Sequence, residues 1–172
     1  MAEGGGGMMN WIKSQGSGGL KKVAYLIMEW IMNKVGGGGS IPGAKNGELS
    51  SGGFMNLLKD GSLLCKLGNM LQPGAIGNFT DSPKDKGQML GNLSQFLNFA
   101  KSSGGVPETD LFKPEKVSKG KDFTGMLSTL TNLATNSQSR FGSSGLDFGQ
   151  LTSAAAQGAG KNFLSNLFSK FK

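Results

Sequence analysis

Histidine is absent from the 172-residue chain, and cysteine occurs only once. The chain therefore lacks the side chain that most often serves as a general base and as a metal ligand. A single cysteine excludes an internal disulfide, which suits a reducing compartment, and leaves too few ligands for a structural zinc site. No apolar run reaches the roughly 18 residues of a membrane span, and the Met-Ala-Glu-(Gly)4 start lacks the regions of a signal peptide. These absences predict a cytoplasmic protein.

Glycine, in contrast, is abundant, with 30 residues. Many of these lie in short runs, which are typical of flexible connections because glycine loses the most backbone freedom on ordering. The composition predicts four parts: a flexible segment over 1–19, a helical domain over 20–135, a low-complexity linker over 136–160 and an amphipathic basic helix over 161–172. Within the first part, the apolar patch at 8–12 fits a short helix that covers the domain or anchors a partner.

The net charge is +7, and it is spread along the chain. Residues 1–50 and 51–135 each carry a net of +2, and residues 136–172 carry +3. This excess favours an acidic partner, and composition alone admits actin, nucleic acid and anionic lipid. Nucleic acid fits poorly, because the basic residues are not interleaved with aromatic ones and no nucleic-acid motif occurs. We therefore expect no nucleic acid among the partners.

The stretch 60–74 organises the chain. Leu63, Leu64, Leu67, Met70 and Leu71 have the spacing of one apolar stripe on a helix. The pattern predicts a helix that begins near residue 62, with the Asp or Ser side chain at 60 or 62 as its cap, and that ends at the Pro-Gly pair 73–74. A helix so short and apolar is stable only when other helices cover it.

Three further helices are expected around it, over residues 20–35, 88–101 and 123–134. Trp30 lies on the apolar face of the first, and Asp122 stands where it can cap the last. A short helix at 54–58 leads into the central one, and residues 107–112 fit one tight turn. No segment alternates with a period of two. The sequence therefore predicts an all-α fold, a compact bundle of four main helices plus short helices.

The central stretch contains a sequence pattern that is specific to one protein family. Short stretches elsewhere in the chain match the same family. The residues of the central pattern are Asp60, Gly61, Leu64, Cys65, Leu67, Asn69, Leu71, Pro73 and Gly74. The supporting matches are Glu29-Trp30-Ile31, Asn92-Leu93, Phe96-Leu97, Asp110-Leu111-Phe112 and Thr129-Leu130. With these residues in this order, the sequence resembles the calponin-homology domain of the calponin and transgelin type over residues 20–135. Three features depart from that pattern: the Lys-Pro-Glu-Lys-Val at 113–117 replaces an acidic stretch, the loop 36–50 is long, and the tail lacks the calponin repeat.

The resemblance implies filamentous actin, or an actin-associated protein, as the partner class. It therefore implies a cytoskeletal protein that decorates, stabilises or cross-links actin filaments. An alternative is an adaptor whose domain docks a non-actin partner, either a microtubule or a regulatory protein.

Basic residues are the candidates for such contacts. One cluster lies in a predicted loop, two lysines open the first helix and could extend that face, and three lie in the tail. In order, they are Lys113, Lys116, Lys119 and Lys121; Lys21 and Lys22; and Lys161, Lys170 and Lys172. Each group is either a solvated face or a salt-sensitive electrostatic contact, since exposed charges are screened over about 8–10 Å.

The apolar stripe of residues 161–172 has three interpretations, namely packing on the domain, docking on a protein partner or lying on a membrane. No residue fits a catalytic role. Cys65 belongs to a core helix, where an inert packed thiol is expected, and capping explains Asp60. No phosphate-binding loop occurs. We expect no enzymatic activity, no cofactor and no metal.

Overall fold

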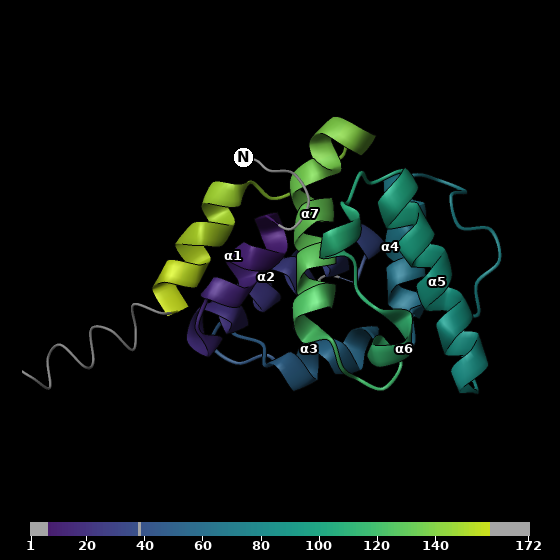
Figure 1. The fold of residues 1–172 in the computed structure, drawn as a ribbon, viewed down its shortest axis with the longest axis horizontal. Coiled ribbons are helices and arrows are strands. Elements are labelled where there is room, and N and C mark those ends of the chain that lie inside the picture. The colour runs from purple at the N-terminus through teal and green to yellow at the C-terminus, as the bar shows by residue number, and fades with distance from the viewer. Residues whose placement is uncertain (1–6, 38, 159–172) are drawn as a thin grey trace, which may run out of the picture.

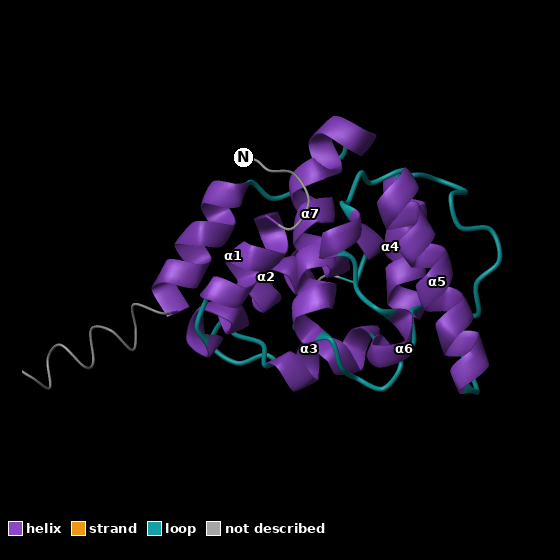
Figure 2. Cartoon of the chain, viewed as in Figure 1, coloured by secondary structure: helices purple, strands orange, loops and turns teal. Residues whose placement is uncertain are grey.

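The computed structural model describes residues 7–37 and 39–158 (Figure 1). The elements are α1 (Gly7–Ser14), α2 (Ser17–Val35), α3 (Ser51–Leu58), α4 (Ser62–Leu71), α5 (Lys86–Ser102), the 3-10 turn η1 (Glu108–Asp110), α6 (Pro114–Val117) and α7 (Phe123–Phe141). Residues 148–158 form a further helix. Figure 2 shows helices and loops only over this part of the chain, where an isolated bridge between Lys45 and Glu48 is the one strand-like pairing. The predicted all-α fold is confirmed.

Local signals fix the ends of several helices. Ser50 caps α3 by accepting a hydrogen bond from the backbone N–H of Gly53 (3.1 Å), and Asp85 caps α5 by accepting one from Gln88 (2.8 Å). Both side chains satisfy an N–H group that has no partner within its helix. Gly36 ends α2 at φ +84°, a left-handed conformation that glycine adopts without steric cost.

The central helix α4 is covered by other helices, as expected, but α3 takes the place predicted for the last core helix, α7, which is not among its main packing partners. Helix α4 packs against α2, α3 and α5, and Leu64, Cys65 and Leu67 are completely buried. Met70 is an exception, because its side chain is 56% exposed although it was placed on the stripe. The buried face is rotated towards Cys65 and Gly68. At Gly68 a Cβ atom would lie 2.7 Å from Cδ1 of Ile76, so the missing side chain admits that neighbour.

The third main helix shows a similar rotation. By spacing, Met89 and Leu97 belong to the apolar stripe of α5, but they are only partly buried. Asn92 and Phe99 are buried instead, beside Leu93, Phe96 and Ala100. The ring of Phe99 stacks on Phe141 from the end of α7, with centroids 5.4 Å apart.

The chain after residue 134 differs from the expected linker. Helix α7 continues to Phe141 and ends at Gly142 (φ +65°). The helix over 148–158 then packs back on the domain, with Leu151 and Ala155 buried. A Cβ atom on Gly19 of α2 would lie 2.8 Å from the carbonyl oxygen of Ala155, so the two helices approach closely because both carry small residues there. The prediction of a linker over 136–160 was wrong for this packed part.

The N-terminal apolar patch forms α1. This helix covers the domain, which is the first of the two roles that the sequence allowed for the patch. Ile12 is completely buried, and α1 packs against α7. Trp11 meets Phe148 edge-on, with ring centroids 5.0 Å apart. Helices from the two ends of the described chain therefore lie together. Residues 1–6 of the expected flexible segment and the expected basic helix 161–172 lie outside the described residues.

Candidate interaction surface

The predicted basic loop forms a lysine surface next to the start of α7. Lys113, Lys116, Lys119 and Lys121 are all exposed. The short helix α6 runs through the loop, and its completely buried Val117 fixes it to the core. Because the backbone is anchored while the ammonium groups lie in solvent, the loop presents its charges on a fixed support. We call these four residues the lysine loop.

Asp122 holds the lysine loop in place, in a role that differs from the predicted one. It stands at the N-cap position of α7 but caps no N–H group of that helix. Its Oδ2 atom instead accepts a hydrogen bond from the backbone N–H of Lys113 (2.8 Å), which ties the two ends of the loop together. Asp122 has φ +71°, which is uncommon for a residue with a side chain and costs on the order of 1 kcal/mol. The carboxylate lies against Gly125, where a Cβ atom would collide with it.

The two lysines at the start of α2 point to different places. Lys21 is exposed and lines a cleft of about 250 Å³ with Ser17, Leu20, Ser51 and Phe123. Phe123 is the first residue of α7 and comes two positions after Lys121, so this cleft adjoins the lysine loop. The lining is mainly apolar, and Lys21 is the one lysine among its lining residues. The structure therefore joins Lys21, and not Lys22, to the lysine loop.

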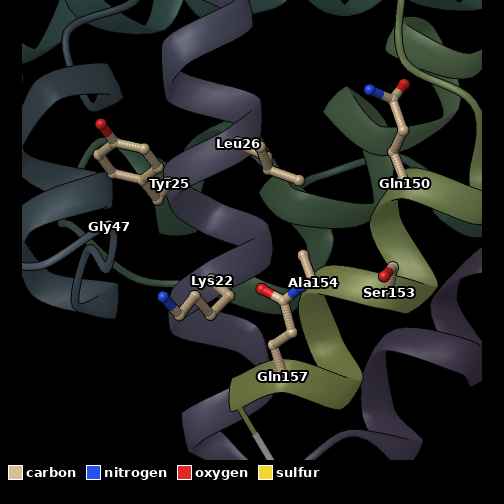
Figure 3. A pocket seen from close by; sticks show the side chains of 8 residues that line it. All are labelled: Lys22, Tyr25, Leu26, Gly47, Gln150, Ser153, Ala154 and Gln157. Atoms are coloured by element: carbon tan, nitrogen blue, oxygen red, sulfur yellow. The ribbon is translucent and has the colours of Figure 1, made fainter.

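Lys22 faces a separate cleft between α2 and the helix over 148–158 (Figure 3). Its Nζ atom donates a hydrogen bond to the carbonyl oxygen of Asn46 (3.4 Å). The cleft has a volume of about 410 Å³ and is lined by Lys22, Tyr25, Leu26, Gly47, Gln150, Ser153, Ala154 and Gln157. Successive helical residues point about 100° apart, which is why adjacent lysines reach different surfaces. Lys161, Lys170 and Lys172 lie outside the described residues.

The start of the central pattern forms a joint between helices, and Asn92 of α5 is its centre. The Nδ2 atom of this buried residue donates to the carbonyl oxygens of Asp60 (3.0 Å) and Thr80 (2.8 Å), and its Oδ1 atom accepts from the N–H of Thr80 (2.8 Å). Gly61, at φ +78°, fits directly against it, because a Cβ atom there would lie 2.6 Å from Cβ of Asn92. One amide thus connects the start of α4, the loop over 75–85 and α5.

Asn69 organises the other end of α4 in the same way. Its Oδ1 atom accepts from the N–H of Ile76 (2.8 Å), and its Nδ2 atom donates to the carbonyl oxygen of Ile76 (3.0 Å). The enclosed turn contains Pro73 and Gly74, and Gly74 has φ +78°. Trp30, which belongs to one of the supporting matches, is buried and donates from Nε1 to the carbonyl oxygen of Ser144 (3.1 Å). Hydrogen bonding and packing therefore explain these residues of the central pattern and of the matches around it.

The family model for the calponin homology (CH) domain matches residues 21–139. The chain belongs to this family. The match begins in α2 and ends near the end of α7, so it covers the joint and the lysine loop. Helix α1 and the helix over 148–158 lie outside the matched residues.

Similar curated proteins include myophilin, calponin-2 and a Rho guanine nucleotide exchange factor. Myophilin of Echinococcus granulosus is 34% identical over 49% of this chain and 44% of its own length. Human calponin-2 is 35% identical over 56% of this chain and 30% of its own length. Human Rho guanine nucleotide exchange factor 6 is 34% identical over 47% of this chain and 10% of its own length. The matched regions therefore span less than half of each of these relatives.

Asp110 is a buried polar residue of this CH domain whose role the sequence did not reveal. Its side chain accepts a hydrogen bond from the N–H of Met9 in α1 (3.1 Å) and another from Nδ2 of Asn132 in α7 (3.0 Å). Its carbonyl oxygen accepts from the hydroxyls of Ser128 (2.5 Å) and Thr129 (2.9 Å). Asp110 therefore attaches α1 to the domain, a function that no local pattern could indicate because Met9 is 101 positions away.

Cys65 is a packed thiol. It is completely buried, and its Sγ atom donates to the carbonyl oxygen of Asn92 (3.3 Å). Burial, and then the Asp60 carboxylate, raise the pKa of the thiol from 9.0 to about 12. The thiolate is the reactive form, so these surroundings oppose reactivity. Within the described residues, no group of three or more Cys, Asp or Glu side chains could hold a metal ion, and no helix is long and apolar enough to cross a membrane.

We expect the native protein to resist labelling of Cys65 by a disulfide reagent such as DTNB at pH 8, because both burial and the raised pKa suppress the thiolate. In denaturing guanidinium one thiol per chain should react within minutes. Native labelling at the rate of the unfolded chain would contradict the structure.

The raised pKa of Cys65 also predicts that the stability of the fold changes at alkaline pH. The folded state favours the neutral thiol, so its contribution to stability is present below about pH 9 and is lost as pH rises towards 12.

Proposed function

We propose that this CH domain is a binding module, not an enzyme, and that it binds filamentous actin through the lysine loop and Lys21. The family match and the similarity to calponin-2 support a cytoskeletal role in the cytoplasm. The observation that carries the choice of surface is the position of Lys21, which shares a cleft with Phe123 at the end of the lysine loop. Lysines separated by about 100 positions in sequence thereby form one basic surface around an apolar cleft.

The geometry of this surface suits an acidic filament. The loop backbone is fixed by Val117 and by the bond between Asp122 and Lys113, so little additional ordering is required on binding. The exposed ammonium groups supply charge complementarity, which mainly raises the association rate and fixes orientation. The apolar floor made by Leu20 and Phe123 can accept a side chain of the partner, as interface centres commonly do.

Co-sedimentation with filamentous actin over a series of salt concentrations tests this proposal. We expect the wild-type chain to pellet with filaments at low salt and to be released as salt rises. The double variant K119E/K121E should weaken binding by about tenfold or more at low salt, because it reverses two exposed charges. An unchanged affinity for this variant would exclude the lysine loop, and absence of wild-type pelleting at low salt would exclude direct binding.

A matched control separates the local effect from that of net charge. The variants K119E/K121E and K101E/R140E each lower the formal net charge from +7 to +3. Arg140 lies in the last turn of α7, and Lys101 lies in the last turn of α5, where the nearby Gly104 accepts a hydrogen bond from Asn136 of α7. Both therefore lie near the end of α7 that is opposite Phe123. We expect K101E/R140E to retain at least half of the wild-type affinity.

A second candidate function is a signalling or cytoskeletal adaptor with a non-actin partner, either a microtubule or a regulatory protein. The similarity to Rho guanine nucleotide exchange factor 6 favours it, because that name describes a signalling protein. Under this alternative, affinity capture would enrich tubulin or a regulatory protein while actin was absent. The segment 161–172 remains a candidate second contact, with a protein or a membrane, and two weak contacts on one chain can bind more strongly than either alone.

A further inference from the structure

A lysine and two serines meet where the chain leaves α7, at a place that the proposed filament contact does not use. The Nζ atom of Lys34, in the last turn of α2, donates hydrogen bonds to the hydroxyls of Ser143 (2.6 Å) and Ser144 (3.0 Å). These serines belong to the connection between α7 and the helix over 148–158. An ammonium group can form much stronger bonds with an anion than with two neutral hydroxyls.

We propose that Ser144 is a phosphorylation site whose phosphate binds Lys34. Ser144 is exposed, whereas Ser143 is partly buried and exchanges backbone and side-chain hydrogen bonds with Ser137. The carbonyl oxygen of Ser144 accepts the bond from Trp30 Nε1 (3.1 Å), so the residue is held with its hydroxyl at Lys34. The acceptor is thus both accessible to an enzyme and positioned beside the cation.

The surroundings have space for the added group. A cleft of about 370 Å³ opens at this point and is lined by Leu26, Glu29, Trp30, Asn33, Lys34, Ser144, Gly145 and Leu146. Asn33 can contribute an amide donor, whereas the carboxylate of Glu29, which also lines the cleft, has the same sign of charge as a phosphate and favours placing it on the Lys34 side. Arg140, exposed four positions before Ser144, offers a cation to an acidic kinase cleft.

The modifying enzyme is an ATP-dependent serine kinase that selects basic residues on the N-terminal side of its acceptor. Oγ of Ser144 attacks the γ-phosphorus of ATP, the bond from that phosphorus to the bridging oxygen breaks, ADP leaves, and the hydroxyl proton passes to the kinase base. The product carries a charge of about −1.5 to −2 at pH 7. Its charge-assisted bonds to Lys34 connect the end of α2 to the segment that leads into the helix over 148–158, and this helix is thereby held more firmly on the domain.

Installing phosphoserine at position 144 of the full chain by genetic encoding tests the contact. Tm should rise by about 2–4 °C over the unmodified chain, and amide exchange over residues 148–158 should slow. In ³¹P NMR, the second pKa of the phosphate should fall below its ordinary value of about 6, because a nearby cation favours the dianion. In the K34M background all three effects should disappear. A phosphate that leaves Tm and exchange unchanged, or effects that persist in K34M, would overturn the proposal.

Treatment of the native chain with ATP and a basophilic serine kinase tests accessibility. Mass spectrometry should locate the phosphate at Ser144, and incorporation should be lost in S144A while S139A is modified normally. Incorporation at Ser139 or Ser118 in place of Ser144 would show that the assignment of the acceptor is wrong. Both experiments are independent of filament binding, so they remain decisive whatever the co-sedimentation shows.

Discussion

Replacement of Asn92 by leucine should destabilise the protein by about 3–5 kcal/mol, although the two side chains have the same branched skeleton. The change removes the partner of three backbone groups, the carbonyl oxygens of Asp60 and Thr80 and the N–H of Thr80. Each buried polar group left without a partner costs about 1–3 kcal/mol. Chemical denaturation followed by circular dichroism measures the loss, which corresponds to a fall in Tm of roughly 10 °C or more.

Gln95→Leu is a matched control for this prediction. Gln95 lies one turn further along α5 and donates to the carbonyl oxygen of Asn78 in the same 75–85 loop, but that bond is exposed. Water can replace it, so we expect a loss below about 1 kcal/mol. If N92L and Q95L lost similar small amounts of stability, Asn92 would not be the centre of the joint.

Gly61→Ala should cost about 3–5 kcal/mol, an unusually large effect for the addition of one methyl group. Two causes combine. The backbone has φ +78°, where an L-residue pays about 1–2 kcal/mol. The new Cβ atom would also lie 2.6 Å from Cβ of Asn92 and 2.9 Å from the backbone N of Leu93, and such crowding of a packed helix costs about 1–3 kcal/mol more.

Gly74→Ala separates these two causes. Gly74 has the same φ of +78°, but no atom lies within 4 Å of the place where its Cβ would stand. We expect it to lose only the backbone component of about 1–2 kcal/mol. Denaturation curves of the two variants under identical conditions would show the difference, and equal losses would exclude the close contact between α4 and α5.

Periodicity was sufficient to predict the main helices, since apolar spacing and glycine or proline ends are local signals. The covered central helix, the buried Trp30 and the packed Cys65 all followed from it. It was less accurate about which face turns inward. Met70 belongs to the stripe by spacing but lies outside the packed arc, because Gly68 lets Ile76 approach the helix on the other side.

Long-range contacts explain what sequence patterns could not predict. Residues 148–158 read as low complexity, but their small residues allow Ala155 to approach Gly19 of α2 closely. Asp110 binds α1 across the domain, and Asp122 bonds to Lys113 in place of the expected helix cap. The lysines of the candidate surface were recognisable from charge alone. Which of them lie together could not be read from charge, because the adjacent residues Lys21 and Lys22 point about 100° apart on α2 and line different clefts.

Zero-length cross-linking to filamentous actin tests the central claim most directly. A carbodiimide joins a lysine amine to a carboxylate only where the two are in contact, and mass spectrometry then identifies the lysine. The proposed surface predicts cross-links from Lys21 and from Lys113, Lys116, Lys119 or Lys121. Cross-links confined to Lys34 and Lys101, or none to the filament at low salt, would contradict it.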